Sequence, residues 1–217
     1  MASSYRFHER AERAERECTE YLKQLHWLIV PAANYANDGA PMVEAANRNQ
    51  AIVMPDQIGM KNGRMASFDS KWKSQAVPRR NRDNRLFTGI DKHSYTHYRR
   101  FQIESGMPVV VVFLHDKENE VRCGAIDRLD QNQAPHCTQE QYPDSKGGMH
   151  NWWYEDIPLW MSYTDMKLCI RDRILAPTDI PSECWPSRPK ASVHHRPDPT
   201  QQSLFEDFSA PKRGMHG

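Results

Sequence analysis

Two strand-like runs joined by a short turn constrain the fold of this chain more than any other feature. The runs are residues 53–59 and 65–71, and Lys61-Asn62-Gly63 between them has the composition of a tight turn. Side chains two apart on a strand point to the same face, so Asp69 and Lys71 are expected to project together. If the first run folds back beside the second, Asp56 meets them. The sequence therefore predicts two carboxylates and a lysine at one place.

This set of residues suits a magnesium ion, which prefers oxygen ligands and keeps several of its waters. Asp56 and Asp69 can hold the ion and still leave positions for a phosphate oxygen and a water. The metal would lower the pKa of that water, and Lys71 would position it or neutralise charge developing on phosphorus. The alternative is structural: Asp56 caps a turn, and Asp69 pairs with Lys71 on a solvent face, because D-x-K often occurs by chance.

The same residues resemble the signature of the PD-(D/E)xK nuclease superfamily, read here as Pro55-Asp56 followed by Asp69-Ser70-Lys71. The resemblance extends to an Arg/Glu-rich amphipathic helix upstream, with apolar residues at helical spacing. They are Cys18, Tyr21, Leu22, Leu25 and Leu28.

Phage and archaeal Holliday-junction resolvases of this superfamily open with a similar helix. In that helix the metal-site glutamate stands seven residues before the leucine that matches Leu22. The resemblance therefore implies Glu15 as the metal-site residue, with Glu12 as the alternative. The structural alternative is that Glu15 is a solvated charge on the face of the helix. The resemblance covers about residues 8–127. This sequence departs from the resolvases at residues 32–51, where the segment between the first strand and Pro55 is longer than theirs. The substrate class of the resolvases therefore does not transfer safely to this chain.

The resemblance implies an α/β fold with a central mixed β-sheet flanked by helices, a restriction-endonuclease-like core. It also implies Mg²⁺ as cofactor, with Mn²⁺ as a substitute, and catalytic residues Asp56, Asp69, Lys71 and Glu15. The nearest resemblance implies a branched-DNA substrate and a homodimer that cuts two strands symmetrically.

The order of patterns along the chain independently favours an α/β domain. We expect helices at about 4–26 and 92–105, strands at 27–31, 52–60, 64–73, 108–115 and 119–127, and loops at 32–51 and 74–91. Aromatic residues are dense at 152–160, where they would stack bases or, as we favour, anchor a late helix in the core; residues 161–175 have helical spacing.

Basic residues are concentrated directly after Lys71 although the whole chain has a net charge of only +1. Residues 71–100 hold nine basic and two acidic side chains, a local net charge of 9 − 2 = +7. Such a stripe is typical of nucleic-acid binding, and the alternative is a flexible charged loop without a partner. The predicted DNA-binding residues are Lys73, Arg79, Arg80, Arg82, Arg85, Arg99 and Arg100.

The end of the chain differs in composition from the rest. Seven prolines lie within residues 177–217, so we expect a disordered tail at 186–217, after a nuclease domain at 1–185 with an extension at 128–185. Within the tail, Gln201-Gln202-Ser203-Leu204-Phe205 resembles the bacterial sliding-clamp-binding motif. That resemblance implies that Leu204 and Phe205 fill a pocket on the clamp while Gln201 binds at its edge, with Ser203 also fitting. The alternatives are a chance match or a peptide that folds back onto its own domain.

The five cysteines include no C-x-x-C pair, which favours a reducing compartment, and the longest apolar run, 107–114, is too short to cross a membrane. We therefore expect a protein of the bacterial or phage-infected cytoplasm.

Three functions fit these observations. The first is a magnesium-dependent, resolvase-like DNA endonuclease. The second is a clamp-associated nuclease or nickase that acts on foreign, mismatched or replicating DNA. The third is a DNA- and clamp-binding module without catalysis.

Overall fold

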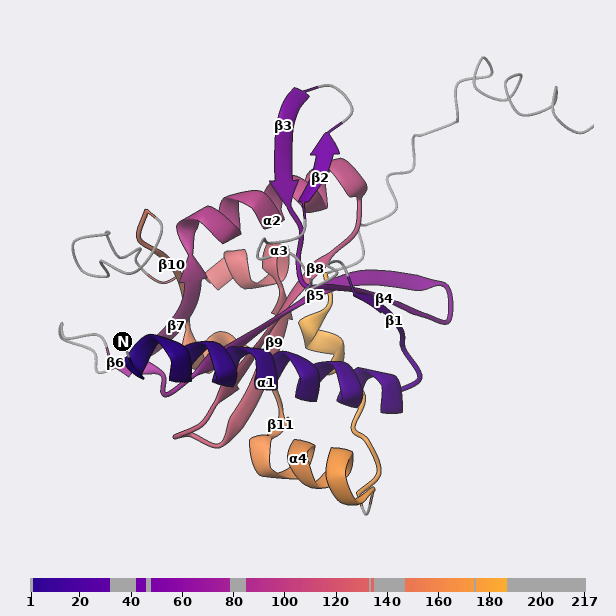
Figure 1. Ribbon diagram of the computed structural model, residues 1–217, viewed down its shortest axis with the longest axis vertical. Coiled ribbons are helices and arrows are strands. Elements are labelled where there is room, and N and C mark those ends of the chain that lie inside the picture. The colour runs from indigo at the N-terminus through magenta and orange to yellow at the C-terminus, as the bar shows by residue number, and fades with distance from the viewer. Residues whose placement is uncertain are drawn as a thin grey trace, which may run out of the picture. The chain divides into compact units, whose positions relative to one another are not determined.

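A computed structural model shows a mixed central sheet with helices on both faces (Figure 1). The structure describes residues 2–31, 42–45, 48–78, 85–132, 134, 147–173 and 175–186. Six strands form the sheet in the order β1 (Leu28–Pro31), β4 (Gln57–Lys61), β5 (Arg64–Lys73), β8 (Val109–His115), β9 (Glu120–Ala125) and β11 (Leu159–Ser162). β5 and β8 are parallel, and all other neighbours are antiparallel. The predicted fold class is confirmed.

The hairpin β4–β5 forms where the sequence predicts it. Gln57 pairs with Phe68 at one end and Lys61 with Arg64 at the other. The two turn residues both have positive φ, 50° at Asn62 and 74° at Gly63, as a two-residue type I′ turn requires. Asn and Gly tolerate this backbone better than other residues, so the turn chemistry sets the register that fixes which β5 side chains share a face.

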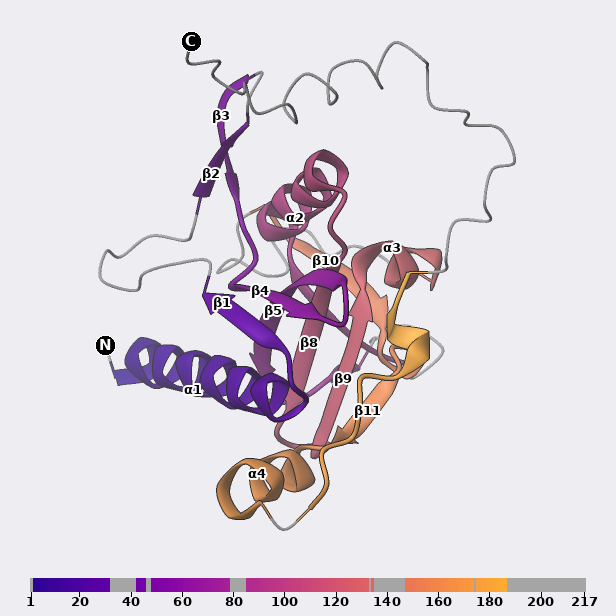
Figure 2. The same cartoon turned by 90° about the vertical axis from the view of Figure 1, so that its right-hand side faces the viewer.

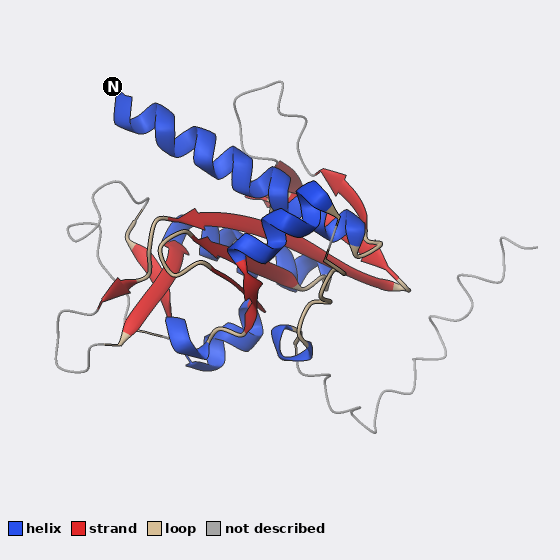
Figure 3. Cartoon of the chain, turned by 90° about the horizontal axis from the view of Figure 1, so that it is seen from below, coloured by secondary structure: helices blue, strands red, loops and turns tan. Residues whose placement is uncertain are grey.

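Helices cover the two faces of the sheet (Figures 2 and 3). α1 (Ala2–Gln24) and α4 (Tyr163–Asp172) belong to one face, and α2 (Lys92–Ser105) and α3 (Ile126–Leu129) to the other. β8 lies between two hydrophobic cores, because Val110, Val112 and Leu114 pack with α1 while Val109, Val111 and Phe113 pack with α2. The continuous apolar run thus forms a strand buried on both sides.

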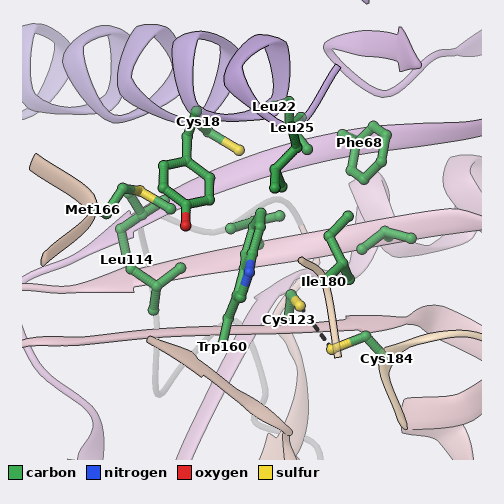
Figure 4. Packing of buried hydrophobic residues seen from close by; sticks show 14 of the residues in the cluster. Cys18, Leu22, Leu25, Phe68, Leu114, Cys123, Trp160, Met166, Ile180 and Cys184 are labelled. Carbon is green, nitrogen blue, oxygen red and sulfur yellow. Dashed lines mark hydrogen bonds between the residues drawn. The ribbon is translucent and has the colours of Figure 1, made fainter. Parts of the chain in front are cut away.

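The amphipathic face of α1 packs as its spacing predicts. Cys18, Leu22 and Leu25 point from the helix toward Phe68, Trp160 and Met166 (Figure 4). Leu28 is the exception: it opens β1 at the sheet edge and is 70% exposed. The helix ends at Gln24, so the helical pattern does not continue to that residue.

Two further sets of strands occupy segments predicted as loops. A two-stranded ribbon, β2 (Met42–Ala45) and β3 (Arg48–Val53), lies within or beside the predicted loop at 32–51. A second sheet, β10 (Met149–Trp153), β7 (Leu86–Asp91) and β6 (Val77–Pro78), takes in parts of the predicted loop at 74–91. Both predictions are wrong at these strands. β2 pairs with β3 and β6 with β7 within the same stretches, and β7 also pairs with the distant β10. The predicted strand 52–60 is interrupted before β4, where Pro55 offers no backbone N–H for a ladder.

In the C-terminal third of the chain, some helices and strands differ from the elements predicted there. Residues 126–127 open α3 instead of closing a strand, and the helix expected at 161–175 is the end of β11 followed by α4. The Ser162 hydroxyl caps α4 by accepting from Asp165 N at 3.0 Å. The aromatic cluster is core, as favoured: Trp152, Tyr154 and Trp160 are buried. These residues lie on or beside β10 and β11, and Trp160 packs in one core with Tyr163 and Met166 of α4.

Short 3₁₀ turns complete the described chain at Asp130–Asn132, Tyr154–Asp156 and Ser182–Cys184. No helix in the described residues is both long enough and apolar enough to cross a membrane. The predicted division into a domain at 1–185 and a tail at 186–217 stays a prediction, because residues 187–217 lie outside the described part of the chain.

Candidate active site

Asp69 is the central residue of a polar cluster on the α2 face of β5. Its side chain is fully buried, and its Oδ1 accepts two short hydrogen bonds, from Lys71 Nζ at 2.7 Å and from the Tyr98 hydroxyl at 2.6 Å. Its Oδ2 is also buried but accepts no hydrogen bond. A buried anionic oxygen without a donor is costly in water-free surroundings, so this atom is suited to a cation.

Strand alternation and helix packing bring these three residues together. Asp69 and Lys71 are two apart on β5 and therefore share a face. α2 begins after its N-cap Asp91, whose carboxylate accepts from Ser94 N and the Ser94 hydroxyl. Tyr98 and Phe101 form the buried stripe of that helix, which places the Tyr98 hydroxyl against Asp69.

Asp56 lies next to Asp69, just before β4. Its Oδ2 accepts a hydrogen bond from Ser70 N at 3.3 Å. Burial, and then the negative charge of Asp69, raise the pKa of Asp56, while Lys71 and the Ser70 N–H oppose the rise. The two carboxylates therefore repel one another, and a divalent cation between them would relieve that repulsion.

Glu15 approaches the same cluster from α1. It is half-buried, and burial raises its pKa, which the charge of Asp69 raises further while Lys71 lowers it. Glu15 also lines a pocket of about 440 Å³ between α1 and the β1–β4 edge, together with Glu12 and Gln57. Glu15 thus lies close enough to Asp69 and Lys71 to feel their charges, whereas its role as a metal ligand stays a prediction.

These side chains do not yet form a closed metal cage. Among the described residues, no three Asp, Glu, His or Cys side chains already converge on one metal position. The donor chemistry nevertheless fits a hard cation, because Asp69 presents an unpartnered oxygen and Asp56 stands beside it with a raised pKa. Asp56 and Asp69 would hold such an ion, and Glu15 would complete or support the site.

The two lysines of β5 differ in how firmly they hold their protons. Burial would lower the pKa of Lys71, but the negative charges of Asp69 and Asp56 and the hydrogen bond to Asp69 outweigh it and hold that pKa well above its usual range. Burial and the positive charge of Lys71 lower the pKa of Lys73 to about 8. Both lysines are therefore mainly cationic at neutral pH, and Lys73 loses its proton at a lower pH than Lys71.

Sequence reasoning missed the polar roles of two residues. Tyr98 is a core residue as predicted, yet its hydroxyl bonds the central carboxylate. Gln57 is only 2% exposed, and both of its amide atoms lack a hydrogen-bond partner. A polar side chain next to the Pro-Asp signature was the available signal for Gln57. Nothing in the sequence pairs Tyr98 with Asp69, 29 positions away.

The predicted DNA-binding arginines that the structure describes are engaged within the protein. Arg85 contacts Asp156 at 3.1 Å and lies 4.2 Å from the ring centre of Trp153. Arg99 and Arg100 form ion pairs with Asp130 at 3.7 Å and Glu104 at 2.7 Å. Their phosphate contacts stay predictions. Arg79, Arg80 and Arg82, and the motif residues Gln201, Ser203, Leu204 and Phe205, lie outside the described residues.

Comparisons with known proteins give a loose likeness of fold to solved structures. No family model matches the chain, and no curated protein matches it. Among solved structures, a Holliday junction resolvase from the archaeal hyperthermophile Archaeoglobus fulgidus aligns with a TM-score of 0.42 and 11% sequence identity. The alignment covers 68% of this chain and 91% of the resolvase.

Proposed function

We propose that this protein is a metal-dependent DNA endonuclease of the PD-(D/E)xK type, acting with Mg²⁺ or, in its place, Mn²⁺. The observation that carries the proposal is the state of Asp69: buried, fixed through Oδ1 by Lys71 and Tyr98, and unpartnered at Oδ2 beside Asp56. A carboxylate pair merely capping a turn or facing solvent would not bury one oxygen without a donor.

The roles of the side chains follow from this geometry. Asp56 and Asp69, with Glu15, hold the metal, which supplies a polarised phosphate and a water of lowered pKa. Lys71 stays protonated and lies 2.7 Å from Asp69, so it neutralises charge developing on the phosphate and does not take up a proton.

Basic side chains hold the DNA backbone in this proposal, which makes binding salt-sensitive and poor in sequence information. Lys73 stands on β5 beyond Lys71, where a phosphate would stabilise its protonated form and raise its lowered pKa. For the arginines, phosphate would replace or join the ion pairs described above. The proposed contacts are Lys73, Arg79, Arg80, Arg82, Arg85, Arg99 and Arg100.

The first experiment measures cleavage with Mg²⁺ of a four-way junction, a flap, a mismatched duplex and a plain duplex. We expect preference for the junction and symmetric cuts by a homodimer. Equal cutting of plain duplex would contradict the preference for branched DNA but would still agree with a nuclease activity.

Asp69→Asn provides the test of the site. It keeps the shape of the side chain but removes the metal-binding charge, so cleavage should fall by about 100-fold or more. Asp179→Asn is the matched control, because Asp179 is 76% exposed and pairs with Lys61. Undiminished cleavage by Asp69→Asn would refute the assignment, and absence of cleavage from the unchanged protein would favour the DNA-binding module.

Attachment to a sliding clamp is a separate proposal that rests on residues 201–205 alone. Replacement of both Leu204 and Phe205 by alanine should abolish binding to purified clamp and leave cleavage of free DNA unchanged. Alanine at Gln202, which departs from the commoner leucine of the motif, is the control. Persistent clamp binding by the double variant would refute the motif.

A further inference from the structure

Four tyrosines in the described residues donate a hydrogen bond to a carboxylate. Tyr95 donates to Asp130 at 2.8 Å, and Tyr154 and Tyr163 donate at 2.6 Å to Glu120 and Glu17. Tyr98 donates to Asp69 at 2.6 Å. Within this set, Asp69 alone combines full burial with an oxygen that has no hydrogen-bond partner. The Tyr98 contact therefore fixes a carboxylate that is left open on its other side.

The two donors to Asp69 differ in how firmly they are held. Lys71 has a flexible side chain that is 28% exposed, and its Nζ lies 5.9 Å from the ring centre of Tyr98. Tyr98 is 3% exposed and its ring is packed in the core with Phe101. A rigid aromatic ring has only two side-chain torsions, so it holds its hydroxyl in place at low entropic cost. Lys71 can turn toward another anion, whereas Tyr98 cannot.

These contacts point to a division of work at the site. A phosphate entering beside the metal would compete with Asp69 for the Lys71 ammonium. If Lys71 moved to the phosphate, Asp69 would keep its orientation only through Tyr98. Without that donor, Asp69 would be free to turn, and the angle of Oδ2 toward the metal would no longer be fixed.

We propose that Tyr98 is a positioning residue that holds Asp69 Oδ1 so that Oδ2 stays directed at the metal while Lys71 serves the phosphate. This inference rests on the proposed metal site, and it assigns to α2 a part in building a site that otherwise belongs to α1, β5 and the segment before β4. Tyr98 itself touches neither the metal nor the DNA.

The test is Tyr98→Phe, which removes the hydroxyl and keeps the ring. Binding of Mn²⁺ alone to the DNA-free protein is followed by the loss of the free-ion signal in electron paramagnetic resonance. We expect about a tenfold weaker Mn²⁺ affinity, in line with the loss of a partner that orients a metal ligand. The matched control is Tyr95→Phe, one turn earlier on α2, which removes the bond to Asp130 and should leave Mn²⁺ affinity unchanged. Equal affinities for Tyr98→Phe and the unchanged protein would overturn the proposal.

A double-mutant cycle that combines Tyr98→Phe with Lys71→Ala tests whether the two donors together hold Asp69 Oδ1. Because each donor supports Asp69 when the other is absent, Tyr98→Phe should lower Mn²⁺ affinity more in the Lys71→Ala background than in the unchanged protein, whatever Lys71→Ala does alone by removing a positive charge from the site. Strict additivity would overturn the shared role. Thermal unfolding of each variant identifies any that fails to fold, in which case Tyr98→Phe alone decides.

Cleavage separates this inference from the proposed function. With Tyr98→Phe, the Mg²⁺ concentration that gives half the maximal rate should rise about tenfold, while the rate at saturating Mg²⁺ recovers to within a few-fold. If Mn²⁺ affinity falls in both Asp69→Asn and Tyr98→Phe but the unchanged protein cuts no DNA, the proposed function fails and the positioning role stands. If cleavage is normal at every Mg²⁺ concentration in Tyr98→Phe, the positioning role fails and the nuclease stands.

Discussion

The two faces of the central sheet have different chemistry, although neighbouring residues of the same strand supply both. On β5, Ala66 and Phe68 face the apolar core under α1, while Asp69 and Lys71 face α2. Alternation in a strand thus separates packing from chemistry by a single residue. A substitution at 68 tests the stability of the fold, and a substitution at 69 tests the site.

Buried titratable groups make the contrast sharper. The α1 face holds Cys18, Cys123, Cys169 and Cys184, all buried and free. Burial raises the pKa of Cys18 to about 12, so this thiol is a small apolar group and not a nucleophile. The α2 face instead buries Asp69, and β7 and β8 add the pair Thr88 and His115.

Removal of the Phe68 ring should have the largest effect on stability. Phe68 is fully buried and packs edge-on against Trp27, with ring centres 5.2 Å apart. Phe68→Ala should lower the free energy of unfolding by about 3–5 kcal/mol through lost burial and a cavity. Denaturant unfolding measures it.

The neighbouring Asp69→Asn is the control for this comparison. It removes a charge that repels Asp56 but also the charge that pairs with Lys71. These two effects offset in part, so it should cost less stability than Phe68→Ala, while its effect on cleavage is large. If Phe68→Ala cost less than Asp69→Asn, the assignment of packing to one face and chemistry to the other would be wrong.

His115 predicts a loss of stability in acid. Its ring is buried, Nε2 lies 3.2 Å from the Thr88 hydroxyl and Nδ1 has no partner. Burial and the positive charges of Lys73 and Arg122 lower its pKa from 6.5 to about 3. The folded state keeps the ring neutral while the unfolded chain takes up a proton. Stability from this residue is therefore present above pH 6.5 and is lost as the pH falls toward 3.

The slope of that loss is about 1.4 kcal/mol for each pH unit below the unfolded pKa. Because Asp56 contributes with the opposite sign over the same range, the loss is read as the difference in free energy of unfolding between the unchanged protein and His115→Gln, which stays neutral, from pH 7 to pH 5. The same slope in both proteins would place the acid sensitivity elsewhere.

The sequence specifies local features of this fold far better than the pairing of distant segments. The turn Asn62-Gly63, the buried run of β8 and the α2 boundaries at Asp91 and Gly106 all follow from local chemistry. The ribbon β2–β3 and the strands β6 and β7 do not. β2 pairs with β3 and β6 with β7 within the segments expected to be loops, while β3 also contacts α2 and β7 also pairs with the distant β10. These tertiary contacts override the expectation of loops.

The site shows the same limit. Spacing and resemblance predict that Asp56, Asp69 and Lys71 meet, and the structure brings them together. Spacing cannot reveal that a core tyrosine donates to Asp69, because burial of the ring and direction of the hydroxyl are set by how α2 packs. Polar atoms that finish a site from another element are the part that sequence reasoning missed.

Asp56 predicts a pH dependence of opposite sign to that of His115. Burial and the charge of Asp69 raise its pKa, so ionisation costs the folded state more than the unfolded chain. Its contribution is complete below the usual pKa of an aspartate and is lost as the pH rises above it. With metal ions chelated, Asp56→Asn should therefore gain on the order of 1 kcal/mol relative to the unchanged protein at pH 8.

Added Mg²⁺ sharpens this test. Binding to the folded state alone should stabilise the unchanged protein and leave Asp56→Asn nearly unaffected. Denaturant unfolding with chelator and with Mg²⁺ gives both differences. A variant that is less stable than the unchanged protein under chelation would show that Asp56 is a structural cap.

The thiols of the α1 face should give the smallest effect. Cys123 and Cys184 lie with their sulfur atoms 2.8 Å apart, between β9 and the 3₁₀ turn that follows Pro181 (Figure 4). Both are wholly buried in a core that the catalytic proposal does not use. Cys184→Ala removes one sulfur atom, so the free energy of unfolding should fall by about 1 kcal/mol, while cleavage and Mn²⁺ affinity stay unchanged.

Because Phe68 belongs to the same core, this substitution also tests whether a small packing defect on the α1 face affects the site on the α2 face. A change in Mn²⁺ affinity would mean that packing under α1 sets the position of Glu15, and the two faces would then be coupled through the helix.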